Sequence, residues 1–363
     1  MFLYSEALAA AFCLSLNGLR DRMIWRRTLR RALKTLKRML LGPIDFPQKI
    51  ELGLEDPQSE VDVWLHGLGD RLNVTQTHLM ACGAPFTICI GFAENYAASV
   101  QFNNRLALRF QEHSGAQRFI GEIGLRFVSS LRVGTRQLCL FRMADYKNRS
   151  VSPLRLWTLY LQYSKIPHSA DVRITERELR AVYVFNVCPR PVALVSVVHE
   201  DSANLFPMDL MGSVGDGYFA FALTSSKAAA PLVERAGRVV LSSVPFEQAA
   251  VATKLGANHR KSSINWNELP FPMMRPGAID ALVPSFALRA REMKVEAVHP
   301  LGSHTLFVAR TIADEHFGDG LQLFNAHGTC KLWINSHTQH HSSRDRNSAV
   351  ISDSVKGSIA TGP

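Results

Sequence analysis

The stretch PRPVALVSVVHEDSANLFPMDLMGS, residues 189–213, decides the fold that we expect for the second half of the chain. Residues 191–198 are a continuous apolar run of the kind found in buried strands, and the polar residues 199–203 predict a turn. The run Asn204-Leu205-Phe206-Pro207 that follows fits neither a good helix nor a good strand. We therefore expect unpaired backbone groups there, which a rigid scaffold can offer to a ligand.

The chain has the composition of a globular protein without a bundle of membrane helices. Its 363 residues allow two domains of ordinary size, and 47% of them are hydrophobic and 20% charged. The six cysteines include no C-x-x-C pair, which favours reduced thiols and a cytoplasmic location over a disulfide framework or a zinc ribbon. Walker, H-E-x-x-H and G-x-S-x-G motifs do not occur, so the sequence points away from the enzymes that depend on them.

The net charge of +10 is concentrated near the start of the chain. Residues 1–43 hold nine Lys and Arg and two acids, which leaves only +3 for the remaining residues, so we expect no nucleic-acid partner. Within this segment, apolar residues at steps of three and four predict a basic amphipathic helix over residues 20–41. Such a helix would either pack on its own domain or make peripheral contact with an anionic membrane, and a transit peptide is a third alternative.

Residues 44–165 predict a separate β-rich domain, to which the sequence assigns no function. The expected strands are residues 61–65, 86–90, 105–111, 123–128 and 137–142. The last two form a hairpin around a turn at residues 133–135. A helix at residues 153–163 and a second one opened by a capping box, Thr175 to Glu178, follow these strands.

Residues 166–336 predict a closed or packed β-barrel rather than a doubly wound sheet, because the strands are apolar on both faces and the helices between them are short. The expected strands are residues 191–198, 218–223, 238–244, 293–298, 305–310, 321–324 and 330–334, and the expected helices are residues 231–236 and 245–255. The tail, residues 337–363, is predicted to be disordered, although three histidines there (His337, His340, His341) leave metal capture as an alternative.

Four blocks in the second half resemble a known family in their order and spacing. They are PRPVALVSVVHEDSANLFPMDLMGSV, FALTSSKAAAPLVERAGRVVLSSV, MKVEAVHPLGSHTLFVARTIADE and LQLFNAHGTCKLW. Together they make residues 180–335 similar to the flavin reductase-like, FMN-binding split-barrel family. The resemblance implies a six-stranded split barrel that forms a homodimer, with FMN near the subunit interface and NADH or NADPH as co-substrate. It also implies hydride transfer to the flavin, which would then serve a partner monooxygenase or another acceptor.

The resemblance also implies which residues bind the cofactor. The FMN phosphate would be held by Thr224, Ser225, Ser226 and Lys227, and Arg260 and Lys261 would hold either this phosphate or that of the nicotinamide co-substrate. The ring would be lined by Asn204, Leu205, Phe206, Pro207, Met208, Asp209 and Ser213. His304 and His327 match polar positions near the cofactors, and His304 is a candidate for a catalytic role. A turn rich in hydroxyl groups that leads into a helix suits a phosphate, because the N–H groups of the first helical turn favour an anion.

Two departures from the family pattern weaken this assignment. Ala228-Ala229-Ala230 replaces an acidic residue and a threonine that many members carry, and Asp209 stands where a serine is common. A carboxylate beside the flavin would repel its anionic reduced form. Two alternatives therefore stay open, a split-barrel protein that binds FMN without turnover and an interaction protein that works through its N-terminal half.

Overall fold

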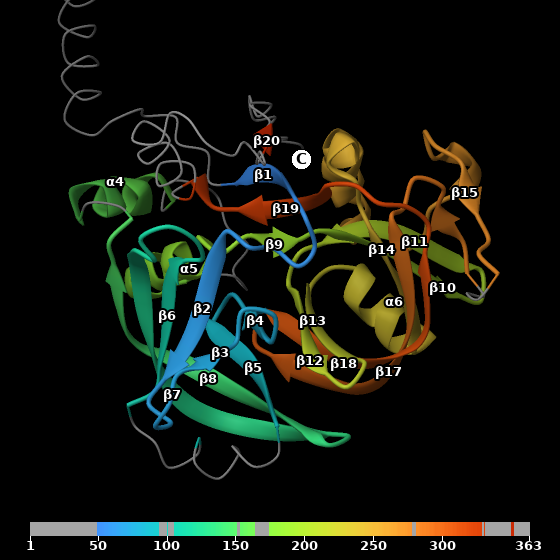
Figure 1. Cartoon of the computed structure of the whole chain (residues 1–363). Coiled ribbons are helices and arrows are strands. Elements are labelled where there is room, and N and C mark those ends of the chain that lie inside the picture. The colour runs from blue at the N-terminus through green and yellow to red at the C-terminus, as the bar shows by residue number, and fades with distance from the viewer. Residues whose placement is uncertain are drawn as a thin grey trace, which may run out of the picture. The chain divides into compact units, whose positions relative to one another are not determined.

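The computed structural model describes residues 49–93, 100, 105–150, 153–163, 174–277, 281–328, 330 and 350–351. The chain divides into two units, Met1–Phe46 and Pro47–Pro363, and every described residue belongs to the second (Figure 1). The predicted amphipathic helix at residues 20–41 and the three tail histidines lie outside the described residues. Among the helices that are described, none is long and apolar enough to cross a membrane.

The first sheet is antiparallel and has seven strands in the order β3-β2-β6-β7-β8-β5-β4. Its strands are β2 (Val61–His66), β3 (Leu72–Asn73), β4 (His78–Cys82), β5 (Thr87–Ala93), β6 (Ala107–Glu112), β7 (Phe119–Val133) and β8 (Arg136–Asn148). The hairpin predicted for residues 123–142 is confirmed, and its turn contains Gly134 at a φ of +56°, a conformation that glycine adopts without strain.

The second sheet also has seven antiparallel strands, in the order β11-β10-β14-β17-β18-β13-β12. Its strands are β10 (Ala193–His199), β11 (Ser202–Met208), β12 (Met211–Gly215), β13 (Tyr218–Thr224), β14 (Arg238–Ser243), β17 (Arg289–Leu301) and β18 (His304–His316). It curls around helix α6 (Ala229–Ala236), whose Leu232 and Val233 pack among the apolar side chains of the strands (Figure 1). The expected mainly β fold with a barrel-like second half is confirmed.

Asn204 to Pro207 correct one prediction, because these residues form part of strand β11. Each pairs with a residue of β10, for example Pro207 with Leu194. The local sequence pattern did not indicate a strand because it contains a proline. At the edge of a sheet a proline is tolerated, since its missing N–H removes no hydrogen bond to a neighbouring strand. The outer edge is also covered, since the Ile264 N–H donates to the Ala203 carbonyl over 2.8 Å. The expected run of unpaired backbone groups is therefore wrong.

The remaining elements connect or cover the two sheets. A third sheet, in the order β20-β1-β19-β9, joins β1 (Ile50–Leu54), β9 (Arg190–Pro191), β19 (Gln322–Ala326) and β20 (Val350–Ile351). The helices are α4 (Pro153–Tyr163), α5 (Glu176–Phe185) and α7 (Ala249–Leu255), with short turns η3 (Phe246–Gln248), η4 (Gly256–Arg260) and η5 (Trp266–Glu268). A small hairpin pairs β15 (Met273–Met274) with β16 (Val283–Pro284).

Three local predictions can be compared directly with these elements. The capping box of α5 is confirmed, because Thr175 and Glu178 exchange both expected hydrogen bonds. Gly256 does not end the helical path, which continues into η4. The strand expected at residues 330–334 is wrong at Cys330, which is helical. The predicted domain boundaries stay predictions. Helix α5 packs on β7 and β8 of the first sheet, although it lies within residues 166–336, the range predicted for the second domain.

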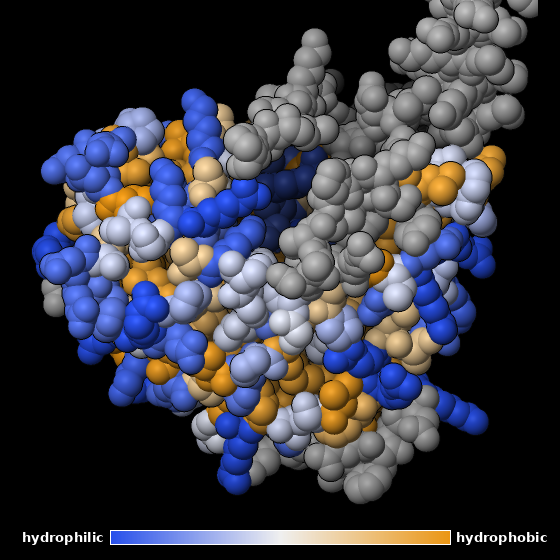
Figure 2. Space-filling view, turned by 180° about the vertical axis from the view of Figure 1, so that it is seen from behind, coloured by the Kyte–Doolittle hydropathy of each residue, from blue (hydrophilic) through white to orange (hydrophobic). Residues whose placement is uncertain are grey.

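The two sheets pack against each other through β4 and β12. Strand β4 contacts β12, β13 and β18, and strand β12 contacts β4, β5 and β8. Both sheets contribute to one apolar cluster, made of Leu79, Ala81, Cys89, Val133, Leu138, Leu140, Val214, Ala220, Ala222, Leu306 and Val308. Away from this contact, hydrophilic side chains cover much of the face seen in Figure 2, with hydrophobic ones between them.

Candidate functional site

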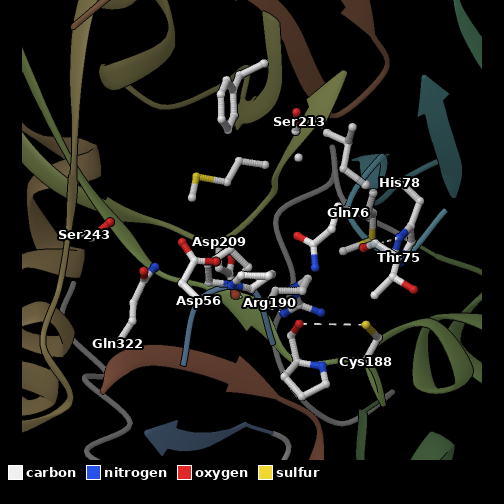
Figure 3. A pocket seen from close by; sticks show the side chains of 18 of the residues that line it. Asp56, Thr75, Gln76, His78, Cys188, Arg190, Asp209, Ser213, Ser243 and Gln322 are labelled. Atoms are coloured by element: carbon white, nitrogen blue, oxygen red, sulfur yellow. Dashed lines mark hydrogen bonds and ion pairs between the residues drawn. The ribbon is translucent and has the colours of Figure 1, made fainter. Parts of the chain in front are cut away.

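A cavity of about 310 Å³ lies where the two sheets meet. Thr75, Gln76 and His78 line it from the first half of the chain, and Asp209 and Ser213 line it from the second (Figure 3). Its wall therefore depends on residues more than 100 positions apart, which no local sequence pattern could bring together.

Asp209 is held as a carboxylate by two partners in this wall. Arg190 Nη2 and Asn325 Nδ2 each donate a hydrogen bond to Asp209 Oδ2 over 2.9 Å. Burial alone would raise the pKa of Asp209, but the Arg190 charge and these hydrogen bonds outweigh it and hold the pKa at about 2. The negative charge that the sequence placed beside the cofactor is thus paired with a guanidinium.

His78 and Cys188 line the same cavity in neutral form. The His78 Nδ1–H donates to the Val74 carbonyl over 2.9 Å, and burial lowers the pKa of His78 to about 4 despite this bond. Burial also raises the pKa of the Cys188 thiol to about 12. At neutral pH these two groups are an uncharged imidazole and a protonated thiol.

The predicted phosphate turn follows directly after β13. Thr224 ends the strand opposite His304 of β18, and the Ser225 N–H donates to the Ser303 carbonyl over 3.0 Å. Helix α6 begins at Ala229, and its N-cap residue, Ala228, has no side chain that could cap the first-turn N–H groups. Pro231 in this turn has no N–H, and the Ala230 N–H donates to the Lys227 carbonyl over 3.3 Å, so the Ala229 N–H is what the turn can add to the anion-binding helix start that the sequence predicted.

Lys227 and Arg260 place two positive charges beside this turn. Burial lowers the pKa of Lys227, and the nearby Arg260 charge lowers it further. Neither side chain forms a salt bridge with any acid in the part of the chain that the structure describes. These two cations, beside a helix start without a side-chain cap, fit the dianionic phosphate of FMN, because the anion would relieve the repulsion between the two positive charges.

His304 lies beside the turn as an uncharged ring. Its Nδ1 accepts from the Ser303 hydroxyl over 2.8 Å, and the Gly83 N–H of the first sheet points at the same atom over 3.3 Å. Burial, with a smaller contribution from Lys227, lowers the pKa of His304 to about 4. Since Nδ1 accepts hydrogen bonds, the proton of the neutral ring is on Nε2.

Comparison with known proteins places this turn in a recognised domain. Residues 185–332 match the family model described as "Flavin reductase like domain". This part of the chain is a flavin reductase-like domain. None of the curated proteins matches the chain in sequence at a significant level.

Several solved structures resemble part of the chain. The FMN-binding protein from Thermus thermophilus with bound p-hydroxybenzaldehyde is 24% identical, with 38% of this chain and 81% of that chain covered and a TM-score of 0.34. The flavin reductase component of a bacterial two-component tryptophan halogenase is 21% identical, covering 43% and 95%, with a TM-score of 0.37. The styrene monooxygenase flavin reductase from Pseudomonas putida S12 is 17% identical, covering 41% and 93%, with a TM-score of 0.34.

The predicted residues of the flavin reductase-like domain fall into separate groups. Asp209 and Ser213 line the cavity, whereas Thr224, Ser225, Ser226 and Lys227 do not. The ring of His259 lies between the two groups, because its Nε2 contacts the Pro207 carbonyl over 2.7 Å and both Lys227 and Asp209 influence its pKa. The structure therefore brings the phosphate turn together with Arg260 and His304 but not with the cavity.

Other predicted residues have structural contacts of their own. Leu205, Phe206 and Met208 are buried in apolar clusters of the second sheet. Asn204 is fully buried, and its Nδ2 donates to the Asn258 and Lys261 carbonyls over 3.0 and 2.8 Å. The Lys261 side chain is exposed. The His327 ring packs against Tyr183 at a tilt of 30°, with ring centroids 4.4 Å apart, and burial lowers the pKa of His327 to about 3. Cofactor roles for these residues stay predictions.

Four residues at the site were not predicted from the sequence. Arg190 pairs with Asp209, His78 lines the cavity, Gly83 reaches His304, and His259 joins the two groups. Arg190 lies inside the stretch that decides the fold, but nothing local marks it as the partner of Asp209. His78 and Gly83 belong to the first half, where the sequence shows no recognisable motif.

Proposed function

We propose that the protein is an FMN-dependent oxidoreductase of the flavin reductase type, which takes hydride from NADH or NADPH. One observation carries the proposal. Lys227 and Arg260 lie close together without an acidic partner among the described residues, next to an uncapped helix start, inside a flavin reductase-like domain. An anion that binds there would be attracted by both positive charges.

The residues divide the work of binding. Thr224, Ser225 and Lys227 would hold the phosphate together with Arg260, and neutral His304 would offer its Nε2–H as a hydrogen-bond donor near this end of the barrel. A bound flavin would supply the hydride-accepting chemistry, so no side-chain nucleophile is required.

Asp209 is less of an obstacle than the sequence suggested. Its charge is paired with Arg190, which weakens the repulsion that a reduced flavin would experience. The objection drawn from this departure therefore loses much of its force. Delivery of the reduced flavin to a partner monooxygenase is part of the proposal, and the acceptor has to be found by experiment.

The test uses the purified full-length chain. FMN is titrated while its fluorescence is followed, and NADH and NADPH oxidation are then measured with and without FMN. We expect saturable FMN binding and oxidation of one nicotinamide that depends on FMN. Protein that neither binds FMN at micromolar levels nor consumes either nicotinamide would overturn the proposal.

A flavin carrier without turnover is the second candidate. Ala228-Ala229-Ala230 favours it, because the helix start lacks the side-chain hydroxyl that would add a phosphate contact. Saturable FMN binding with no oxidation of NADH or NADPH would decide for the carrier.

A further inference from the structure

The two seven-stranded sheets have the same topology. In chain order, the strands β2 to β8 of the first sheet correspond to β10, β11, β12, β13, β14, β17 and β18 of the second. With this correspondence, the order β3-β2-β6-β7-β8-β5-β4 becomes β11-β10-β14-β17-β18-β13-β12, which is the order observed. All pairings in both sheets are antiparallel.

The irregularities of the long hairpins also coincide. Val128 is an extra residue five positions before the end of β7, and Glu296 is an extra residue five positions before the end of β17. On the returning strands, Ala144 and Ile312 are each extra, eight positions after the strand begins. Bulges are specific features of a fold, and two unrelated sheets would not place them at equal positions.

A third bulge occurs on the strands that join the sheets. Ala81 interrupts the register of β4 with β5, and Val214 interrupts that of β12 with β13 in the same place relative to the turn. Both side chains are buried in the apolar cluster that the two sheets share. The matching irregularities therefore lie at the contact itself.

The tight turns of the long hairpins are equivalent in sequence. VGTRQLCLFR, residues 133–142, and LGSHTLFVAR, residues 301–310, share the glycine, a leucine and the final arginine at equal positions. Gly134 and Gly302 both have a positive φ, of +56° and +71°. Each is followed by a hydroxyl residue, Thr135 or Ser303.

These turns make reciprocal contacts between the sheets. The Ser303 hydroxyl accepts from the Ala84 N–H over 3.0 Å, so the turn of the second sheet binds the β4–β5 turn of the first. On the other side, the Thr135 hydroxyl donates to Asp216 over 2.6 Å, so the turn of the first sheet binds the β12–β13 turn of the second. Reciprocal contacts of this kind are the mark of a two-fold interface between equal subunits.

We infer that β2 to β8 are a second copy of the split barrel within the same chain, and that this copy occupies the place of a partner subunit. The homodimer implied by the family resemblance is replaced by an internal pair. The first copy also completes the wall beside His304 with Gly83 and Ala84. This last part rests on the proposed flavin function, whereas the internal pair does not.

The two copies differ where the phosphate would bind. Thr224 pairs with His304 at the end of β13, and Ala93 pairs with Arg136 at the equivalent end of β5. After Thr224 the sequence continues Ser-Ser-Lys, but after Ala93 it continues Glu-Asn-Tyr, with an acid and no cation. Since a carboxylate repels a phosphate, we expect one FMN per chain, held by the second copy.

A cross-link tests the internal pair without any cofactor. Cys82 Sγ lies 3.5 Å from the Ser303 hydroxyl, so a thiol introduced by Ser303→Cys would meet Cys82 across the contact. We expect diamide to cross-link the full chain within itself, seen as a product of single-chain mass on a non-reducing gel and as a joined peptide in mass spectrometry. The control, Ser303→Cys with Cys82→Ser, should give no such product.

Two outcomes would overturn the internal pair. A covalent dimer through these cysteines would show that the contact lies between chains. Failure of the folded variant to cross-link at all would show that the β4–β5 turn does not meet Ser303. Neither result depends on flavin binding, so a failure of the proposed function is distinguished from a failure of this inference.

A mixing experiment tests the completed site. Lys227→Ala removes the phosphate contact from the second copy, and Gly83→Val crowds His304 from the first, because a Cβ at Gly83 would lie only 3.3 Å from His304 Cε1. Each variant should bind FMN about fivefold more weakly or worse. If both parts of the site belong to one chain, a mixture of the two variants still binds FMN weakly. The parent chain is expected to bind one FMN. Recovery of tight binding on mixing, or two FMN per chain, would contradict the single internal site.

Discussion

Gly302 lies against the backbone of Ala84 so closely that a Cβ on the glycine would meet the Ala84 carbonyl oxygen at 2.7 Å. The same Ala84 carbonyl accepts the Ser303 N–H over 2.9 Å. A turn of the second sheet is thus fitted to a turn of the first with no space for a side chain, which makes the position a sensitive probe of the contact.

We expect Gly302→Ala to destabilise the fold more than Gly217→Ala. Both glycines have a positive φ, of +71° and +77°, so both substitutions cost about 1 kcal/mol of backbone strain. A Cβ at Gly217 meets nothing within 4 Å, whereas at Gly302 the clash adds roughly 1–3 kcal/mol. Urea unfolding followed by fluorescence measures the difference, and equal losses would show that the two turns do not touch.

Asp209 should lend the fold stability that is lost in strong acid. Its folded pKa of about 2 is below the ordinary 3.8, so the contribution is complete above pH 3.8 and disappears as the pH falls toward 2. The shift corresponds to about 2 kcal/mol. Asp209→Asn should remove this part of the acid dependence in urea unfolding, and an unchanged acid profile would contradict the Arg190 pairing.

Three buried histidines should destabilise the fold in mild acid. The pKa values of His78, His304 and His327 are about 4, 4 and 3, below the ordinary 6.5, so the unfolded chain takes up protons first as the pH falls. Between pH 6.5 and 5.5 each should cost about 1 kcal/mol of unfolding free energy.

The variant His327→Phe keeps a ring on Tyr183 and removes one of the three titrating groups. Its unfolding free energy should therefore fall less steeply over this pH range than that of the parent. An equal slope would mean that His327 is protonated in the folded chain.

Lys227→Ala should weaken FMN binding by about 1–3 kcal/mol, because a charged hydrogen bond to the phosphate is lost. The matched control is Lys254→Ala, which removes the same charge from an exposed position in the last turn of α7. The control should bind FMN as the parent does in a fluorescence titration. Equal affinities for all three chains would remove Lys227 from the site.

Much of the second half could be predicted from the sequence because its signals are local. The capping box of Thr175 and Glu178, the stop of α6 at Gly237 and the apolar runs of β13 and β14 each depend on neighbours in the chain. The sequence did not predict edge strand β11, because a local pattern does not show its contacts. These contacts are with β10 and with a turn about 60 positions later. The likeness of residues 133–142 to 301–310 was visible in the sequence, but only the equal strand orders show its meaning.

The stretch at residues 189–213 by itself determined a buried strand within a barrel-like fold, because apolar side chains in succession need cover on both faces. Its sequence also placed Asp209 in the position expected beside the cofactor. Only the tertiary structure decided that this carboxylate is paired, since Arg190 and Asn325 reach it from β9 and β19. Folding likewise decided that a second sheet faces the site, because contacts between distant strands depend on how whole sheets pack.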